Sequence, residues 1–145
     1  MSASHLEALF PALAASGYSV ASPRDQRYNC IAWSAGTAHA WWWPAPGGYW
    51  PPDLPRVLST DSFARLFESL GYAICDDDGV EEGFEKVALY AGADGLPTHA
   101  ARQLPSGSWT SKLGRLEDAE HASLAAVCGD QYGSVARGFR RRIGR

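Results

Sequence analysis

The sequence has few cysteines, no long hydrophobic run and no signal-peptide pattern in its first residues. Its three cysteines, Cys30, Cys75 and Cys128, are an odd number, lie far apart and form no C-x-x-C pair, which excludes a disulfide framework and a zinc knuckle. No stretch approaches the ~20 apolar residues that span a bilayer, and the N-terminus lacks the basic and apolar regions of a signal peptide. We therefore expect a cytoplasmic protein with reduced thiols and no membrane partner.

An excess of positive charge is also missing. The net charge is -3 and the sequence pI is near 5.7, so no general field attracts phosphate backbones or anionic lipid, and nucleic acid is not an expected partner. Hydrophobic residues make up 46% of the chain and charged residues 20%, which is typical of compact globular proteins. A length of 145 residues predicts a single domain over 1–145.

Helical patterns dominate the first half of the chain. Ser4 and Glu7 have capping-box spacing, and Pro11 is expected to bend or split the helix that they begin. A second helix is predicted from Thr60, because apolar residues follow at helical spacing and Gly71 is a candidate C-cap.

Strand patterns dominate the second half. A short edge strand is predicted over 72–75, followed by an antiparallel meander with good turn sequences between its strands, over 84–91, 97–104 and 108–114. Residues 116–127 return to a helical pattern, and 131–141 is predicted to close the sheet as a final strand. The predicted fold class is α+β, with a helical N-terminal half and a C-terminal antiparallel sheet.

The segment 41–55 holds five prolines, two glycines and five aromatic residues. It must be an irregular loop, yet it is too apolar to stay in water, so we expect it to pack over the domain. Its rings, among them Trp42 and Trp43, either form a cleft wall that recognises a peptide or sugar, or serve only as a lid over a small core.

The strongest chemical candidates are Cys30 and His99. Asn29 is a candidate N-cap, which puts Cys30 in the first turn of a short helix, where a thiolate is favoured. An ordinary buried cysteine is the competing interpretation, because unpaired cysteine is among the most buried residue types. His99 stands in a later strand, an order that allows a base from the sheet to meet a nucleophile at a helix start.

The turn at 105–107 sets the residue that neighbours His99. If Leu104 pairs with Ser108, Ser111 lies diagonally across from His99 on the same face and can orient the imidazole. A one-residue slip would place Lys112 there instead. His121 is a further histidine that could serve, although its spacing from Glu117 favours an intrahelical charge pair.

These residues resemble a known layout. A helix-start cysteine, a strand histidine and a polar residue twelve positions later are similar to papain-like cysteine hydrolases of the NlpC/P60 and CHAP type, although NlpC/P60 proteins have His, Asn or Gln in place of Ser111. The sequences Y-N-C-I-A-W, W-W-W-P, G-F-E-K-V-A-L-Y, T-H-A-A-R-Q-L and W-T-S-K-L-G more closely resemble an uncharacterised family of small bacterial proteins, over nearly the whole chain.

The resemblance implies a papain-like fold and a thiol hydrolase of the peptidase, amidase or deamidase type, acting on a peptide or protein substrate without a cofactor or metal. It implies Cys30 as nucleophile, His99 as base and Ser111 as the orienting residue. Side chains expected to bind the substrate or the oxyanion are Asn29, Gln26, Trp33, Trp42, Trp43 and Lys112. The rival hypothesis is a binding module that holds a peptide or partner protein without turnover.

Overall fold

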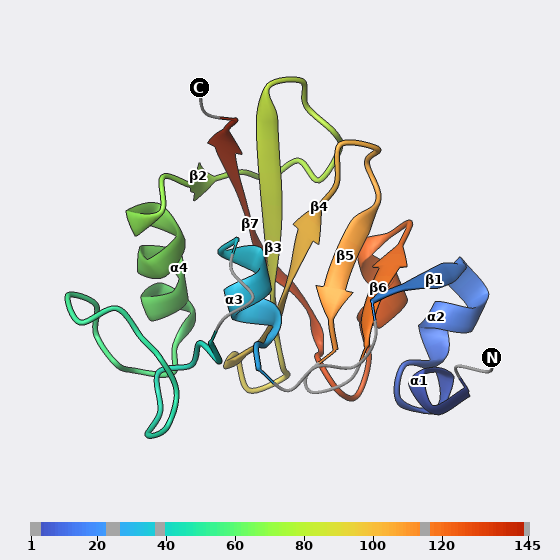
Figure 1. Cartoon of the computed structure of the whole chain (residues 1–145), viewed down its shortest axis with the longest axis horizontal. Helices are drawn as coiled ribbons and strands as arrows, with labels where there is room; N and C mark the ends of the chain where they lie inside the picture. Colours follow the sequence, from blue (N-terminus) through green and yellow to red (C-terminus); the bar gives the residue numbers. More distant parts are fainter. Residues whose placement is uncertain (1–3, 23–26, 37–39, 114–116, 144–145) are drawn as a thin grey trace.

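The computed structural model describes residues 4–22, 27–36, 40–113 and 117–143 (Figure 1). Its helices are α1 (Ser4–Leu9), α2 (Pro11–Ser16), α3 (Cys30–Ser34), α4 (Thr60–Ser69) and the 3-10 helix η1 (Leu124–Val127). Its strands are β1 (Tyr18–Ser22), β2 (Ala73–Ile74), β3 (Phe84–Ala91), β4 (Pro97–Gln103), β5 (Trp109–Lys112), β6 (Asp118–His121) and β7 (Ser134–Arg142).

All seven strands belong to one antiparallel sheet with the order β1-β6-β5-β4-β3-β7-β2. The expected α+β class with an antiparallel sheet is confirmed. The N-terminal half is not purely helical, because β1 pairs with β6 and forms one edge of the sheet. β7 lies inside the sheet between β3 and β2, so the edge opposite β1 is the two-residue strand β2.

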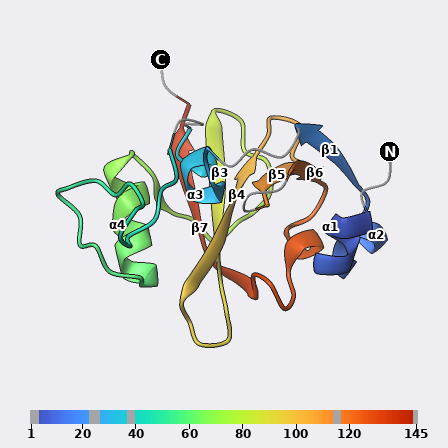
Figure 2. The ribbon, with the colours of Figure 1, turned by 60° about the horizontal axis from the view of Figure 1, so that its bottom comes forward.

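The sheet separates two apolar cores. On one face, α3, α4 and the loop that follows α3 pack on residues such as Leu89 and Ala100. On the other face, α1, α2 and η1 pack on residues such as Tyr90 and Ala101. α1 and α2 therefore lie beside β1 at one end of the sheet, and α4 lies at the other end, as Figures 1 and 2 show.

The predicted helices of the first half are confirmed. Pro11 stands at the start of α2, so the first helical segment is split into α1 and α2. Ser59 caps α4, because its side chain accepts a hydrogen bond from the Ser62 N–H, and the apolar stripe of α4 is buried. The Cys30 helix is shorter than its pattern predicted and ends at Ser34.

The segment 41–55, which we call the aromatic loop, packs against α4, as expected for a loop with so many apolar residues. Trp50 is buried and its indole N–H donates to the Pro55 carbonyl, while the rings of Trp43 and Trp50 both contact Phe63. An isolated bridge joins Trp42 to Tyr49 and closes the loop on itself.

The helix predicted over 116–127 is wrong. Residues 118–121 form β6, and only 124–127 are helical, as η1. Alternation explains the difference: Ala119 and His121 share the buried face of a strand, and tertiary pairing with β1 and β5 overrides the local helical pattern. Glu117 consequently pairs with His5 at 3.0 Å and not with His121.

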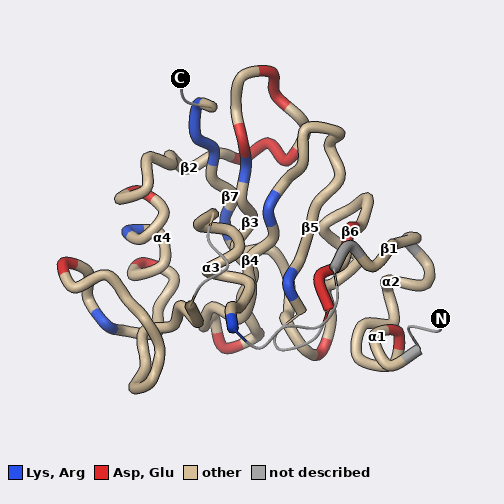
Figure 3. The backbone as a smooth tube through the Cα atoms, in the orientation of Figure 1, with Lys and Arg blue, Asp and Glu red and all other residues tan. Residues whose placement is uncertain are grey.

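Two arginines near the end of β7 pair with acidic residues. Figure 3 shows the basic residues near the end of β7 close to acidic residues in and before β3. Arg140 bonds to Glu81, and Arg141 makes two hydrogen bonds to Glu85. In the part of the chain described here, no helix has the length and apolar character needed to cross a membrane.

Candidate functional site

Cys30 is the first residue of α3 and is almost completely buried. The Asn29 Oδ1 accepts a hydrogen bond from the Ala32 N–H, which fixes the start of the helix. Burial raises the pKa of the Cys30 thiol to about 11, although the N–H groups of Ala100, Ile31 and Cys30 itself, and the charge of Lys112, act in the opposite direction. The thiol is therefore protonated at neutral pH, and its surroundings hold several groups that stabilise negative charge.

A cavity of about 200 Å³ opens beside Cys30. Its lining residues are Asn29, Cys30, Trp41, Trp43, Thr98 and Tyr132. We call this cavity the Trp pocket. None of the described residues that line it carries a carboxylate, an ammonium or a guanidinium group, and its two indoles offer rigid apolar contact area, which suits an uncharged group of a ligand.

Three polar side chains form a buried chain on the opposite face of the sheet. The His99 Nε2 lies 2.9 Å from the Ser111 Oγ, and the same oxygen lies 2.8 Å from the His121 Nε2. The His121 Nδ1 lies 2.8 Å from the Ser123 carbonyl oxygen. We call these three side chains, together with the Ser123 carbonyl that ends the chain, the histidine relay. They come from β4, β5, β6 and the segment before η1, so the sheet itself fixes their spacing.

The remaining nitrogen of His99 has no partner. His99 is fully buried, and its Nδ1 has no hydrogen bond within the described structure. Tyr132 stacks on the ring with 4.0 Å between centroids and 4° between planes, and Tyr90 meets it edge to face. Burial, and to a smaller extent His121, holds the His99 pKa well below its usual range. His99 is therefore a neutral base with one unused ring nitrogen.

Cys30 and His99 lie on different faces of the sheet at β4. Cys30 packs with Ala100, whereas His99 lies opposite Tyr90 in the β3–β4 ladder and shares its face. No hydrogen bond joins the two side chains in the described part of the molecule, so the expected dyad is not preassembled.

Two observations nevertheless connect the pair. The N–H that acts on the Cys30 thiol belongs to Ala100, the residue next to His99. Tyr132, which stacks on His99, also lines the Trp pocket, and a charge on Cys30 adds to the effect of burial in raising the Tyr132 pKa. β4 and β5 pair only at Arg102↔Thr110 and Gln103↔Trp109, so the ladder stops before it reaches His99.

The other predicted site residues fall into different surroundings. Trp43 lines the Trp pocket, but the Trp42 ring packs on Tyr49, and the Trp33 indole N–H donates to the Thr110 hydroxyl. Lys112 is buried on the Cys30 face with its ammonium over the Tyr28 ring. The prediction for Gln26 falls outside the described residues.

The amide of Asn29 lines the Trp pocket but is also used within the fold. Its Oδ1 accepts from the N–H groups of Ala32 and Trp42, and its Nδ2 donates to the Trp42 carbonyl. Asn29 thus links α3 to the aromatic loop. The sequence indicated its capping role but not this link.

Sequence reasoning missed two residues and misplaced a third. Thr98 and Tyr132 line the Trp pocket, and nothing in their local sequence distinguishes them from ordinary strand or aromatic residues. Trp41, a ring of the segment 41–55 that was expected to form a cleft wall, lines the Trp pocket together with Trp43. His121 was expected on a helix. The alternation of Asp118, Ala119, Glu120 and His121 was the available signal for a strand that would place His121 beside Ser111.

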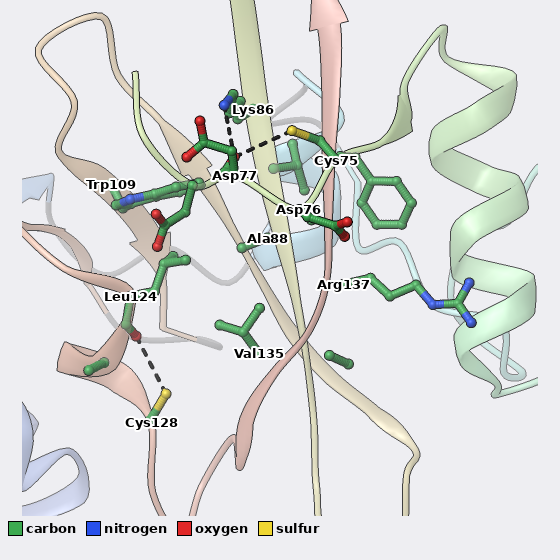
Figure 4. Close-up of a pocket in the computed structure, with 16 residues that line it drawn as sticks. Cys75, Asp76, Asp77, Lys86, Ala88, Trp109, Leu124, Cys128, Val135 and Arg137 are labelled. Carbon is green, nitrogen blue, oxygen red and sulfur yellow. Dashed lines mark hydrogen bonds between the residues drawn. The ribbon is translucent and has the colours of Figure 1, made fainter. Parts of the chain in front are cut away.

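A larger cavity of about 520 Å³ lies away from Cys30, between the 75–78 connection, β3, β7 and η1 (Figure 4). Trp109 and Leu124 form part of its wall, and the carboxylate side chains of Asp76 and Asp78 stand at its rim. Lys86 is engaged inside it, because its ammonium donates to the Asp77 carbonyl. Over the described ranges, no three His, Cys, Asp or Glu side chains gather to hold a metal ion.

Comparison with known proteins gives one family. Neither the curated proteins nor the solved structures yield a match. The model of a domain of unknown function, DUF7689, matches residues 19–140, which include the Trp pocket, the histidine relay and every strand except the first residue of β1 and the last two residues of β7. Since this match covers most of the sequence, the chain belongs to the DUF7689 family.

Proposed function

We propose that this protein is a thiol hydrolase in which Cys30 is the nucleophile and His99 the general base. The observation that carries the proposal is the buried, unpartnered Nδ1 of His99, one residue from the strand N–H that acts on the Cys30 thiol. An unsatisfied buried nitrogen costs about 1 to 3 kcal/mol, so its presence calls for a role. A papain-like arrangement, with a helix-start cysteine and a strand histidine, is part of the proposal.

The reaction proceeds from a neutral pair. Because the pKa of Cys30 is about 11, the thiol loses its proton as it attacks: the proton passes to the His99 Nδ1 while sulfur bonds to the carbonyl carbon. The His99 imidazolium then protonates the leaving nitrogen or oxygen as its bond to carbon breaks. Water, deprotonated by His99, hydrolyses the thioester and restores the thiol.

Two features of the site support this sequence of steps. The main-chain N–H groups of Ile31 and Ala100, which act on the thiolate, are donors for the negative charge that develops beside the sulfur. The Trp pocket gives an uncharged acyl group access to Cys30. A peptide or protein amide, isopeptide or ester fits this chemistry, with no metal or cofactor in any step. The three free cysteines support a cytoplasmic location.

The proposal is tested with p-nitrophenyl acetate, whose acetyl group is small enough for the Trp pocket. Intact-protein mass spectrometry of a Cys75→Ser/Cys128→Ser background should show one acetyl group on Cys30, with release of p-nitrophenol. His99→Gln should slow this acylation by about 100-fold or more, the usual contribution of a general base. Cys30→Ser is the matched blank. Equal acylation in the native background and in His99→Gln would overturn the proposal.

A second candidate function is the binding of a peptide or partner protein without turnover. The raised thiol pKa and the missing Cys30–His99 hydrogen bond favour it. In that case N-acetyl-phenylalanine amide should shift the indole N–H resonances of Trp41 and Trp43 but not that of Trp33, equally in native protein and in Cys30→Ala. Binding of this probe together with no acylation of Cys30 would establish the binding module in place of the hydrolase.

A further inference from the structure

The direction of the hydrogen bonds in the histidine relay is determined by its last member. The Ser123 carbonyl oxygen can only accept, so the His121 Nδ1, 2.8 Å away, carries a proton and donates it. Burial lowers the His121 pKa, so this ring is neutral and its Nε2 carries none. That nitrogen must therefore accept a hydrogen bond from the Ser111 hydroxyl.

The same reasoning continues to His99. The Ser111 hydroxyl donates its one proton to the His121 Nε2. Its oxygen can therefore only accept a hydrogen bond from the His99 Nε2–H. A neutral His99 with a proton on Nε2 has none on Nδ1. The unpartnered Nδ1 is consequently a free lone pair and not a buried N–H.

The reverse direction is much less favourable. If Ser111 donated to His99, its oxygen would have to accept from the His121 Nε2, and His121 would carry protons on both nitrogens. The structure would then hold a buried imidazolium, and His99 would keep a buried N–H without an acceptor. Only the first direction satisfies every group with neutral rings.

We propose that His121 is a positioning residue: acting through Ser111, it fixes the His99 tautomer in which Nδ1 is unprotonated and able to take the proton of Cys30. The role for that nitrogen rests on the proposed thiol chemistry, whereas the tautomer itself does not. His121 touches neither Cys30 nor the Trp pocket, so it acts only through the hydroxyl of Ser111 and the Nε2 of His99.

The tautomer can be observed directly in the native chain. Long-range proton–nitrogen correlation spectra of protein labelled with ¹⁵N-histidine should show His99 protonated at Nε2 with a pyridine-type Nδ1, and His121 protonated at Nδ1. His5→Gln, which alters the histidine that bonds to Glu117 outside the relay, assists assignment and should leave both patterns unchanged. A protonated Nδ1 on His99 would overturn the proposal whatever the variants do.

Two substitutions separate positioning from mere packing. In His121→Phe, no acceptor remains for Ser111, so the His99 pattern should become a mixture of tautomers and acetylation of Cys30 by p-nitrophenyl acetate should fall at least about tenfold. In His121→Gln, the amide oxygen can accept from Ser111, so both the tautomer and the rate should be retained. Equal rates in native protein and in a folded His121→Phe would overturn the positioning role.

The two proposals fail in different ways. If native spectra show the expected tautomer but Cys30 is never acetylated, the hydrolase is wrong and the relay stands as a structural device. If Cys30 is acetylated in a His99-dependent way while His99 carries its proton on Nδ1, the hydrolase stands and His121 is not its positioning residue.

Discussion

Burial, more than pairing, sets the state of the individual reactive residues. Cys30 and His99 are each shielded from water, and each is driven to its neutral form: the thiol pKa is raised and the imidazole pKa is lowered. His121 is shifted in the same direction as His99. A neutral pair avoids the cost of two buried charges in the folded protein.

The two buried histidines should make the protein sensitive to mild acid. Their folded pKa values lie below the unfolded value of about 6.5, so the unfolded chain binds more protons at low pH, and the stability present above pH 6.5 is lost as pH falls below it. The free energy of unfolding, from urea titrations at pH 7 to 5, should fall by up to about 1.4 kcal/mol per pH unit for each histidine.

A matched pair of variants identifies the source of that slope. His121→Gln removes one of the two buried groups and should reduce the slope. Leu9→Ala removes an exposed side chain that does not titrate and should leave the slope unchanged. A slope that stays the same in His121→Gln would show that His121 does not titrate as its burial requires.

Cys30 should limit stability at the alkaline side. Its folded pKa of about 11 lies above the unfolded value of about 8.5, so the unfolded chain ionises first and stability is lost as pH rises between these values. Urea titrations at pH 8 and 10 should show a smaller loss in Cys30→Ala than in the native chain. Cys75→Ser, which replaces a thiol outside the buried core, is the control for the loss of a cysteine as such. Parallel losses in native protein and Cys30→Ala would mean that the thiol is not shielded.

At the scale of secondary structure, the site depends on the junction between α3 and the aromatic loop. Asn29 caps the helix and also holds Trp42 by two hydrogen bonds, so one side chain fixes both the helix start at Cys30 and the aromatic loop. This is why a helix of only five residues can hold Cys30 in a defined position.

Replacing Asn29 should destabilise this junction measurably. Asn29→Ala removes the cap and leaves the Trp42 N–H and carbonyl without their partner, so the free energy of unfolding should fall by about 1 to 3 kcal/mol. Asn29→Asp keeps the acceptor and loses only the donor, and should fall between native protein and Asn29→Ala. Chemical denaturation followed by circular dichroism gives the three values. An alanine variant as stable as the native chain would contradict the role of this side chain.

Elements with a clear local signal were predictable, and those defined by distant pairing were not. α4 has a cap and a complete apolar stripe, and β3 matches its predicted limits of 84–91. β1 was missed because its partner β6 was assigned to a helix, so nothing in the sequence indicated what Tyr18–Ser22 would pair with. The same error hid the contact between Ser111 and His121.

The candidate site shows the same division. The turn at 105–107 allowed Ser111 to be placed near His99, because the register of a hairpin follows from its turn, and the Leu104 N–H does bond to the Ser108 carbonyl. The face of the sheet on which Cys30 packs was not readable, since it depends on how α3 crosses β4. The roles of these residues in catalysis remain predictions.

For the molecule as a whole, α1 and α2 complete the apolar core on the sheet face of Tyr90 and Ala101. The DUF7689 match begins at residue 19 and leaves out α1 and α2, yet Leu6, Phe10 and Leu13 from these helices are buried against the sheet face that carries the histidine relay. Burial of three such side chains contributes about 5 to 9 kcal/mol, which is comparable with the total stability of an ordinary domain. We therefore expect the stability of the region matched by the family to depend on residues outside it.

Two neighbouring leucines on α1 provide the test of that dependence. Leu6 is fully buried and Leu9 is 40% exposed, so Leu6→Ala should cost about 2 to 5 kcal/mol, whereas Leu9→Ala should change stability by no more than about 0.5 kcal/mol. Removal of residues 1–16 should abolish cooperative thermal unfolding, because the apolar core to which Leu6, Phe10 and Leu13 contribute would be opened to water. Differential scanning calorimetry measures all three. A cooperative transition in the truncated chain near the native melting temperature would show that the sheet and its relay are stable without α1 and α2, and that the region matched by the family is sufficient to fold.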